Sequence, residues 1–254
     1  MLRGIVFSAS LSFLIVCPLN RARAAIVAMQ SSDFTLPQTE QFDELRIFYQ
    51  SQLSVNLIVS TASISPSDLA GASLFVGWLP ATNYLASEIS ALSGFLSGGG
   101  HILFVGENGS FSGANNAISA GTAALGGSMS IVNSIVDAGF HLATTANGQI
   151  LPHLLTTGVN RFEYAAPSGL SGVIGGQGFF LDTSLANTFG ASQLVGGGRL
   201  TILSDTNVVD FADLTLDNDT FFLNVAIIPE PSTVILAAMG LVGLAAFGSR
   251  RRKR

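Results

Sequence analysis

The chain has 254 residues, of which 48% are hydrophobic and only 11% are charged. Once two hydrophobic ends are set aside, about 200 residues remain, an ordinary length for one domain with a substantial core. This middle part, residues 25–228, holds fifteen carboxylates against three arginines, which leaves a formal charge of −12. Such a surface repels phosphate backbones and therefore argues against nucleic acid as a partner.

The N-terminal segment has the layout of a secretion signal. Arg3 precedes a largely apolar run of twelve residues, and small residues follow at Ala22 and Ala24. Because the run is too short to span a bilayer comfortably, a signal helix that signal peptidase cuts after Ala24 is favoured over a permanent anchor. A lipoprotein signal would use Cys17, but Val16 occupies the preceding position, where such signals need a small residue. With its only cysteine in the signal, the exported part has no thiol for a disulfide, a metal or a nucleophile.

The first half of the middle part alternates apolar runs with helical patterns. Helices are expected over 38–52 and 84–97, where Tyr84 belongs to the apolar face of the second helix. Apolar runs that alternate with helices are typical of a parallel sheet covered on both faces. The expected strands are residues 25–29, 55–59, 73–78 and 101–105.

The second half has weaker patterns. A helix is expected over 115–125, and strands are expected over 161–165, 178–182 and 199–203. We therefore expect one doubly wound α/β domain with a largely parallel, flavodoxin-like sheet. In this sheet the runs 55–59, 73–76, 101–105 and 199–203 should be neighbouring strands.

The C-terminal segment has three parts in a fixed order. A Pro-Glu-Pro triplet is followed by fourteen apolar residues at 234–247 and then by a basic cluster. The uncharged stretch 232–249 would form a helix of about 27 Å, which just spans a bilayer, with the cations on the cytoplasmic side. A buried helix of a soluble protein is the alternative, but it does not explain the basic cluster beside the apolar run. The residues concerned are Pro229, Glu230 and Pro231, and Arg250, Arg251 and Arg252.

This tail resembles the PEP-CTERM sorting signal of exported bacterial proteins. The resemblance implies processing by an exosortase, a membrane-embedded protease that cuts near Pro229, so that the triplet is a substrate and not a catalytic group. The implied precursor is anchored in the inner membrane, faces the periplasm and later reaches the cell surface or an extracellular matrix. The chain then divides into a signal peptide at 1–24, an exported domain at 25–228, and a sorting tail with a transmembrane helix at 229–254.

The middle part resembles the glutamine-amidotransferase-like superfamily, particularly its noncatalytic-looking DUF4350-type branch. The segments that carry this resemblance are 92–100, 105–108, 154–159, 198–205 and 217–219. In the amidotransferases a nucleophilic cysteine lies on the turn after a strand, but the matching turn 106–109 has no thiol. Glu107 is therefore a weak candidate nucleophile or base, and the favoured interpretation is a turn whose Glu107 and Asn108 side chains bind nearby amides.

No metal or cofactor site follows from the remaining motifs. The three histidines have no metal-binding spacing, and the glycine triplets match neither G-x-G-x-x-G nor a P-loop. The acidic stretch from Asp205 to Asp219 could bind calcium, although its spacing differs from an EF-hand and a solvated surface with helix-capping carboxylates is favoured.

Two classes of function remain open at this level. The first is a noncatalytic surface or matrix module that binds polysaccharide or another envelope component. The second is a hydrolase or transferase that uses Glu107 together with a histidine. The absence of every recognised nucleophile favours the first class.

Overall fold

The computed structural model describes residues 26–31, 39–58, 63–175, 177–209 and 216–227. The expected signal helix and the expected transmembrane helix both lie outside these residues. Among the helices of the described residues, none combines the length and the apolar composition of a membrane-spanning segment.

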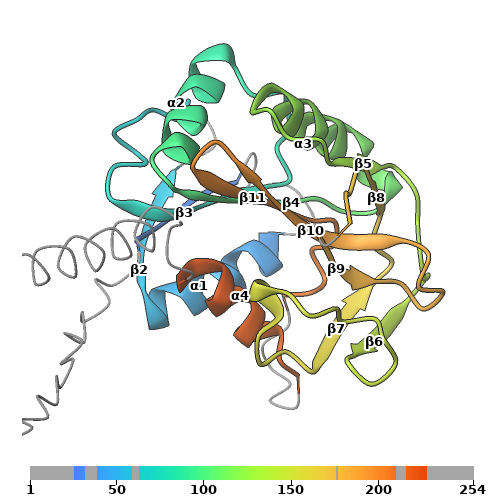
Figure 1. Cartoon of the computed structure of the whole chain (residues 1–254). Coiled ribbons are helices and arrows are strands. Elements are labelled where there is room, and N and C mark those ends of the chain that lie inside the picture. Colours follow the sequence, from blue (N-terminus) through green and yellow to red (C-terminus); the bar gives the residue numbers. More distant parts are fainter. Residues whose placement is uncertain (1–25, 32–38, 59–62, 176, 210–215, 228–254) are drawn as a thin grey trace, which may run out of the picture.

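A seven-stranded sheet forms the centre of the domain (Figure 1). Its first five strands are parallel, and the last two are antiparallel to their neighbours. In spatial order the strands are β2 (Ser54–Ile58), β1 (Ile26–Ser31), β3 (Ala72–Trp78), β4 (His101–Val105), β11 (Gly198–Leu203), β10 (Thr188–Val195) and β9 (Gly178–Leu181). The expected mixed α/β fold with a mostly parallel sheet is thus confirmed.

Helices cover both faces of this sheet (Figure 1). Helices α1 (Thr39–Gln52) and α4 (Asn218–Ile227) lie on one face, while α2 (Ala86–Ser97) and α3 (Ser112–Ala124) lie on the other. Alternate residues of each inner strand enter opposite cores, as the two-residue period of a strand requires. In β4, for example, Leu103 joins the core under α1 and α4, whereas Phe104 joins the core under α2.

One feature of the sheet differs from the expectation. The run at 55–59 is not beside the run at 73–76, because β1 lies between β2 and β3. The strand at 199–203 is the last strand along the chain, as expected, and it also pairs with antiparallel β10, which precedes it through a tight turn with Gly196 at φ +61°. A backbone with positive φ is available to glycine at little cost, which explains the glycine run at this turn.

The remaining elements, together called the smaller lobe, lie toward the β10 and β9 side of the sheet, and their side chains enter both cores (Figure 1). They make two antiparallel pairs and two short 3₁₀ helices that the sequence patterns do not predict, apart from the strand at 161–165. The pairs are β5 (Ser130–Val132) with β8 (Gly169–Ser171) and β6 (Phe140–Thr144) with β7 (Arg161–Ala165), and the 3₁₀ helices are Gly109–Phe111 and Leu154–Thr156.

Both described ends of the domain meet at the amino edge of the sheet. The Ser73 hydroxyl, at the start of β3, lies 3.5 Å from the Ile26 carbonyl oxygen and 3.4 Å from that of Ala226. Ile26 begins β1, and Ala226 is the next-to-last residue of α4. The carboxyl edge of the parallel strands therefore faces away from the points where the signal and the tail join the domain.

Candidate functional site

The turn after β4 encloses Glu107 at the carboxyl edge of the sheet. The Glu107 side chain is 1% exposed. One of its carboxylate oxygens accepts hydrogen bonds from the backbone N–H and the side-chain amide of Asn108, both at 2.9 Å. The other accepts the backbone N–H of Thr206 at 3.0 Å and also the Thr206 hydroxyl. Four donors thus surround a carboxylate that has almost no contact with solvent.

The side chain of Asn115, on α3, is hydrogen-bonded to the backbone of this turn. Its side-chain oxygen accepts the backbone N–H of Glu107 at 3.0 Å, and its amide donates to the carbonyl oxygens of Glu107 at 2.7 Å and Asn108 at 3.2 Å. Asn115 is fully buried. The turn is therefore rigidly bonded on its backbone as well as on its side chain, which agrees with the interpretation of Glu107 and Asn108 as amide-binding turn residues.

A second buried carboxylate, Asp205, follows the neighbouring strand β11. Its oxygens accept the backbone N–H groups of Ala165 at 2.6 Å and of Asn207 at 2.8 Å, together with the Asn207 side-chain amide at 3.1 Å. Burial and then the charge of Glu107 raise the pKa of Asp205 to about 8. The strands β4 and β11 thus bring together two carboxylates that are far apart in the sequence, a pair that the sequence patterns miss.

The acidic stretch is not uniformly solvated in the part that the structure describes. Asp205 is buried, which contradicts the expectation of a solvated residue. Asp217 instead accepts the backbone N–H groups of Asn160 at 2.7 Å and Arg161 at 3.0 Å. Asp210 and Asp213 lie outside the described residues. Among the residues that are described, no group of three or more His, Cys, Asp or Glu side chains is placed to hold a metal ion.

The three histidines do not complete a catalytic pair with Glu107. His101 contacts the Val225 carbonyl oxygen at 2.9 Å and the Thr201 hydroxyl at 2.8 Å, at the amino end of β4. His141 contacts the Ala138 carbonyl oxygen, and Nδ1 of His153 accepts the backbone N–H of Leu155. None of these hydrogen bonds involves Glu107, whose side chain accepts its four bonds from Asn108 and Thr206.

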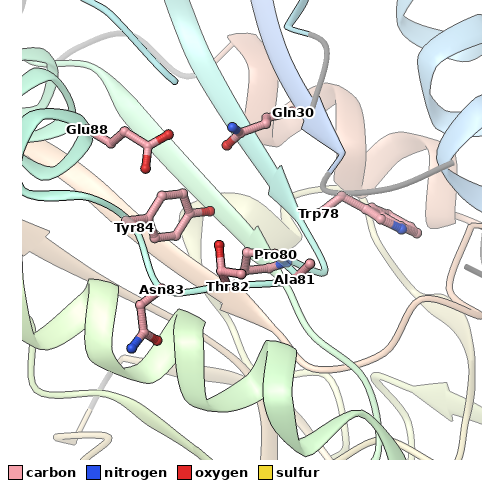
Figure 2. A pocket seen from close by; sticks show the side chains of 8 residues that line it. All are labelled: Gln30, Trp78, Pro80, Ala81, Thr82, Asn83, Tyr84 and Glu88. Atoms are coloured by element: carbon pink, nitrogen blue, oxygen red, sulfur yellow. The ribbon is translucent and has the colours of Figure 1, made fainter. Parts of the chain in front are cut away.

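A cavity of about 220 Å³ opens at the same edge of the sheet, between the ends of β1 and β3 (Figure 2). From β1 the chain turns through α1 to β2 on one side, and from β3 it continues through α2 to β4 on the other. Open α/β sheets bind ligands at such a reversal of strand order, outside the carboxyl ends of the strands. The cavity is lined by Gln30, Trp78, Pro80, Ala81, Thr82, Asn83, Tyr84 and Glu88.

Three side chains from different elements converge on this cavity. Figure 2 shows the side-chain amide of Gln30, the hydroxyl of Tyr84 and the carboxylate of Glu88 pointing toward one another, whereas Trp78 points away. The carboxylate of Glu88 is held by the backbone N–H groups of Ile64 at 3.1 Å and Leu85 at 2.7 Å. It is therefore a fixed acceptor, placed by the first turn of α2.

Tyr84 lies just before α2, which begins at Ala86 and not at residue 84 as expected. Its ring packs against Phe104, with the ring centroids 5.5 Å apart. A Cβ atom on Gly77 would lie 2.6 Å from the Tyr84 hydroxyl, so glycine is needed in β3 at this point. The hydroxyl is buried and has no hydrogen-bond partner among the described residues.

A second hollow of about 490 Å³ lies in the smaller lobe. It is lined by residues 145, 148, 150–153 and 156–160, and His153 is its one titratable lining residue. Burial and then the charge of Arg199 lower the pKa of His153 to about 4. Because its ring stacks on Phe179 at 5.1 Å and Nδ1 accepts the Leu155 N–H, His153 is held as a neutral structural group.

Solved structures with low sequence identity share the fold. The mmIFT52 N-terminal domain aligns with a TM-score of 0.56 and 15% identity, over 79% of this chain and 95% of that one. The cytoplasmic protein STM1381 from Salmonella typhimurium LT2 aligns with a TM-score of 0.55 and 13% identity, over 80% and 98%. A β-galactosidase from Rahnella sp. R3 aligns with a TM-score of 0.51 and 11% identity, over 81% of this chain but only 31% of the enzyme. At these identities the similarity shows the fold alone.

Sequence comparison identifies the tail and not the domain. No curated protein matches the chain. No family match supports the amidotransferase-like assignment of the middle part. Residues 228–253 match the PEP-CTERM protein-sorting motif, directly after α4. The chain therefore ends in the sorting motif of exported, exosortase-processed proteins.

Proposed function

We propose that this protein is a noncatalytic binding module of the bacterial envelope, released toward the cell surface or extracellular matrix by an exosortase. In this proposal the exported domain, residues 25–228, is a noncatalytic relative of the amidotransferase-like superfamily. The observation that carries the proposal is the sorting motif that follows α4 directly. The tail then leaves the domain at the amino edge of the sheet, and the cavity between β1 and β3 faces away from the membrane.

The turn after β4 supports a noncatalytic role. A nucleophile or a general base needs a lone pair that can reach a substrate. The Glu107 carboxylate is 1% exposed and accepts four hydrogen bonds from its own chain. These donors hold the carboxylate in place, and they leave little of it accessible to a substrate.

Processing of the tail is the first test. In cells with an exosortase, the surface-released protein is expected to end near Pro229 and to lack the terminal arginines, whereas the full-length form should accumulate in membranes of cells without the enzyme. Such cleavage is expected because proline at both ends of the triplet disfavours a helix, which a protease would otherwise have to unwind. C-terminal mass spectrometry of both fractions measures the result.

A pair of variants sharpens this test. Replacing Pro229 and Pro231 together by alanine is expected to block release, while Ser232→Ala, one residue further on, should be released like the wild type. Surface-released protein that retains Arg254 would reject processing at the motif.

The competing hypothesis of a Glu107-dependent hydrolase or transferase is tested by substitution. Wild type and Glu107→Gln should both show no turnover above buffer on ester, amide and glycoside substrates, because Glu107 is enclosed and no histidine accompanies it. Glu40→Gln, at an exposed position of α1, is the matched control. Turnover by the wild type and the control that disappears in Glu107→Gln would establish the enzymatic alternative.

A further inference from the structure

The cavity between β1 and β3 is lined by polar side chains and one carboxylate, without a cation among the described residues. Of the eight described residues that line it, one carries a carboxylate and none carries a positive charge. An anionic ligand would meet the Glu88 carboxylate without a compensating cation. A purely apolar ligand would cover the polar groups of Gln30 and Glu88 without bonding them, which costs free energy.

The Tyr84 hydroxyl at the cavity lacks a hydrogen-bond partner among the described residues. The chain has three tyrosines. The hydroxyl of Tyr49 donates to the Phe222 carbonyl oxygen at 3.0 Å, and that of Tyr164 donates to Asp137 at 2.6 Å. Only the Tyr84 hydroxyl, among these three, is buried without a partner in the described structure. A buried hydroxyl without a hydrogen bond is unfavourable, and a ligand in the cavity would supply the bond.

The protonation state of Tyr84 determines whether a ligand must offer its hydroxyl a hydrogen-bond donor or an acceptor. Burial and then the nearby Glu88 charge raise the pKa of Tyr84 well above its usual value. Tyr84 therefore keeps its proton and needs an acceptor for it, whereas each Glu88 oxygen, already bonded to one backbone N–H, has a lone pair left to accept a further donor. A primary ammonium ion offers donors only, so it would leave the Tyr84 proton unpaired. A group of hydroxyls on one ring offers donors and acceptors together.

The wall of the cavity is held in a strained conformation. Leu79, between Trp78 and Pro80, has φ +40°, a region that residues with a side chain rarely adopt. Such strain is found at binding and catalytic sites, where the surrounding structure maintains it. Leu79 directly precedes the lining residues 80–84.

We propose that this cavity binds one neutral sugar ring of an envelope polysaccharide, through the side chains of Gln30, Tyr84 and Glu88. The identification of the sugar as part of an envelope polysaccharide rests on the proposed function. The volume of about 220 Å³ is smaller than pockets for drug-sized ligands, so it suits a single ring and not a nucleotide or a long oligosaccharide.

Binding is tested on the purified full-length chain in detergent, so that the result does not depend on export or processing. Saturation-transfer NMR titrations with D-glucose, D-galactose and D-mannose are expected to show saturable, millimolar binding of at least one sugar. For that sugar, Tyr84→Phe should weaken binding about tenfold, since it removes one buried hydrogen bond. Tyr84→Phe should melt at the wild-type temperature, because its hydroxyl has no partner to lose in the free protein.

Tyr49 provides the matched control. Tyr49→Phe also removes one buried hydroxyl, but on the opposite face of the sheet, and it should leave the affinity for the sugar unchanged. A second variant, Thr82→Val, removes a hydroxyl from the lining with little change in volume and should also weaken binding.

Three results would overturn the proposal. They are the absence of saturable binding by any of the neutral sugars, equal losses in Tyr84→Phe and Tyr49→Phe, and tighter binding of glucuronate or glucosamine than of the corresponding neutral sugar. Failure of tail processing with Tyr84-dependent sugar binding would reject only the proposed function. Normal processing without sugar binding would reject only this site.

Discussion

Replacement of Asn115 by alanine is expected to lower the free energy of unfolding by about 3 kcal/mol, a large part of the stability of an ordinary domain. The change removes three hydrogen bonds between the Asn115 side chain and the backbone of the turn after β4. It leaves the N–H of Glu107 and two carbonyl oxygens without these partners at a site from which water is largely excluded. Asn115→Asp should be at least as destabilising, because a carboxylate oxygen would then face two carbonyl oxygens.

The adjacent residue on α3 is the control for this effect. Asn116 is exposed, and its side-chain oxygen accepts one hydrogen bond from Asn133 at 2.8 Å. Asn116→Ala should therefore change the stability by less than about 0.5 kcal/mol. Urea unfolding with an unchanged m-value measures both variants. Similar losses for Asn115→Ala and Asn116→Ala would show that the bonds to the turn contribute little.

The stability of the domain is expected to peak near pH 6.5 and to fall on both sides. Burial and then the charge of Arg199 lower the pKa of His101 from 6.5 to about 3 and that of His153 to about 4. Below pH 6.5 the unfolded chain therefore binds protons that the folded chain does not, and stability falls as the pH falls. Below pH 6.5 the two histidines lower the stability more than the single carboxyl group of Asp205 raises it as the pH falls.

The titration of Asp205 causes the expected loss of stability above pH 6.5. Its pKa is raised from 3.8 to about 8 by burial and by the charge of Glu107. Between these values the folded protein holds a proton that the unfolded chain has lost, so stability falls as the pH rises. Above pH 6.5 the histidines are neutral in both states and no longer mask this loss. Thermal unfolding from pH 4 to 9 measures the profile.

Substitutions separate the two carboxylates in this profile. Asp205→Asn should remove the loss between pH 6.5 and 8, and Glu107→Gln should reduce it, because it removes the charge that repels the Asp205 carboxylate. Asp219→Asn, at an exposed position, should keep the wild-type profile. An undiminished alkaline loss in Asp205→Asn would assign the titration to another group.

The expected and the observed folds agree where the sequence pattern is long. The strand at 101–105 and the helix at 84–97 correspond to β4 and α2, because a run of four apolar residues after His101 indicates burial on both faces and a long amphipathic segment has a distinct period. The short pairs of the smaller lobe lack such patterns. Likewise the insertion of β1 between β2 and β3 depends on how the strands pair, which local periodicity does not encode.

The candidate site could be predicted only in part. Glu107 is recognisable because a carboxylate directly follows an apolar strand. Its neighbour Asp205 is not, because the two residues are 98 positions apart and meet only through the parallel pairing of β4 with β11. Tyr84 fits the apolar pattern of a helix, and nothing in that pattern shows that its hydroxyl lies unpaired over Gly77.

The sequence by itself determined that this protein ends in a sorting motif of exported proteins and that residues 25–228 contain no thiol. The Pro-Glu-Pro triplet, the apolar run and the terminal cations are contiguous, so their order can be read directly, and the absence of a thiol from the exported part is a matter of composition. Only the tertiary structure decided that Glu107 is enclosed, that the cavity lies between β1 and β3, and that this cavity is opposite the ends of the domain. These properties depend on strand order and burial, which arise when segments far apart in the chain pack together.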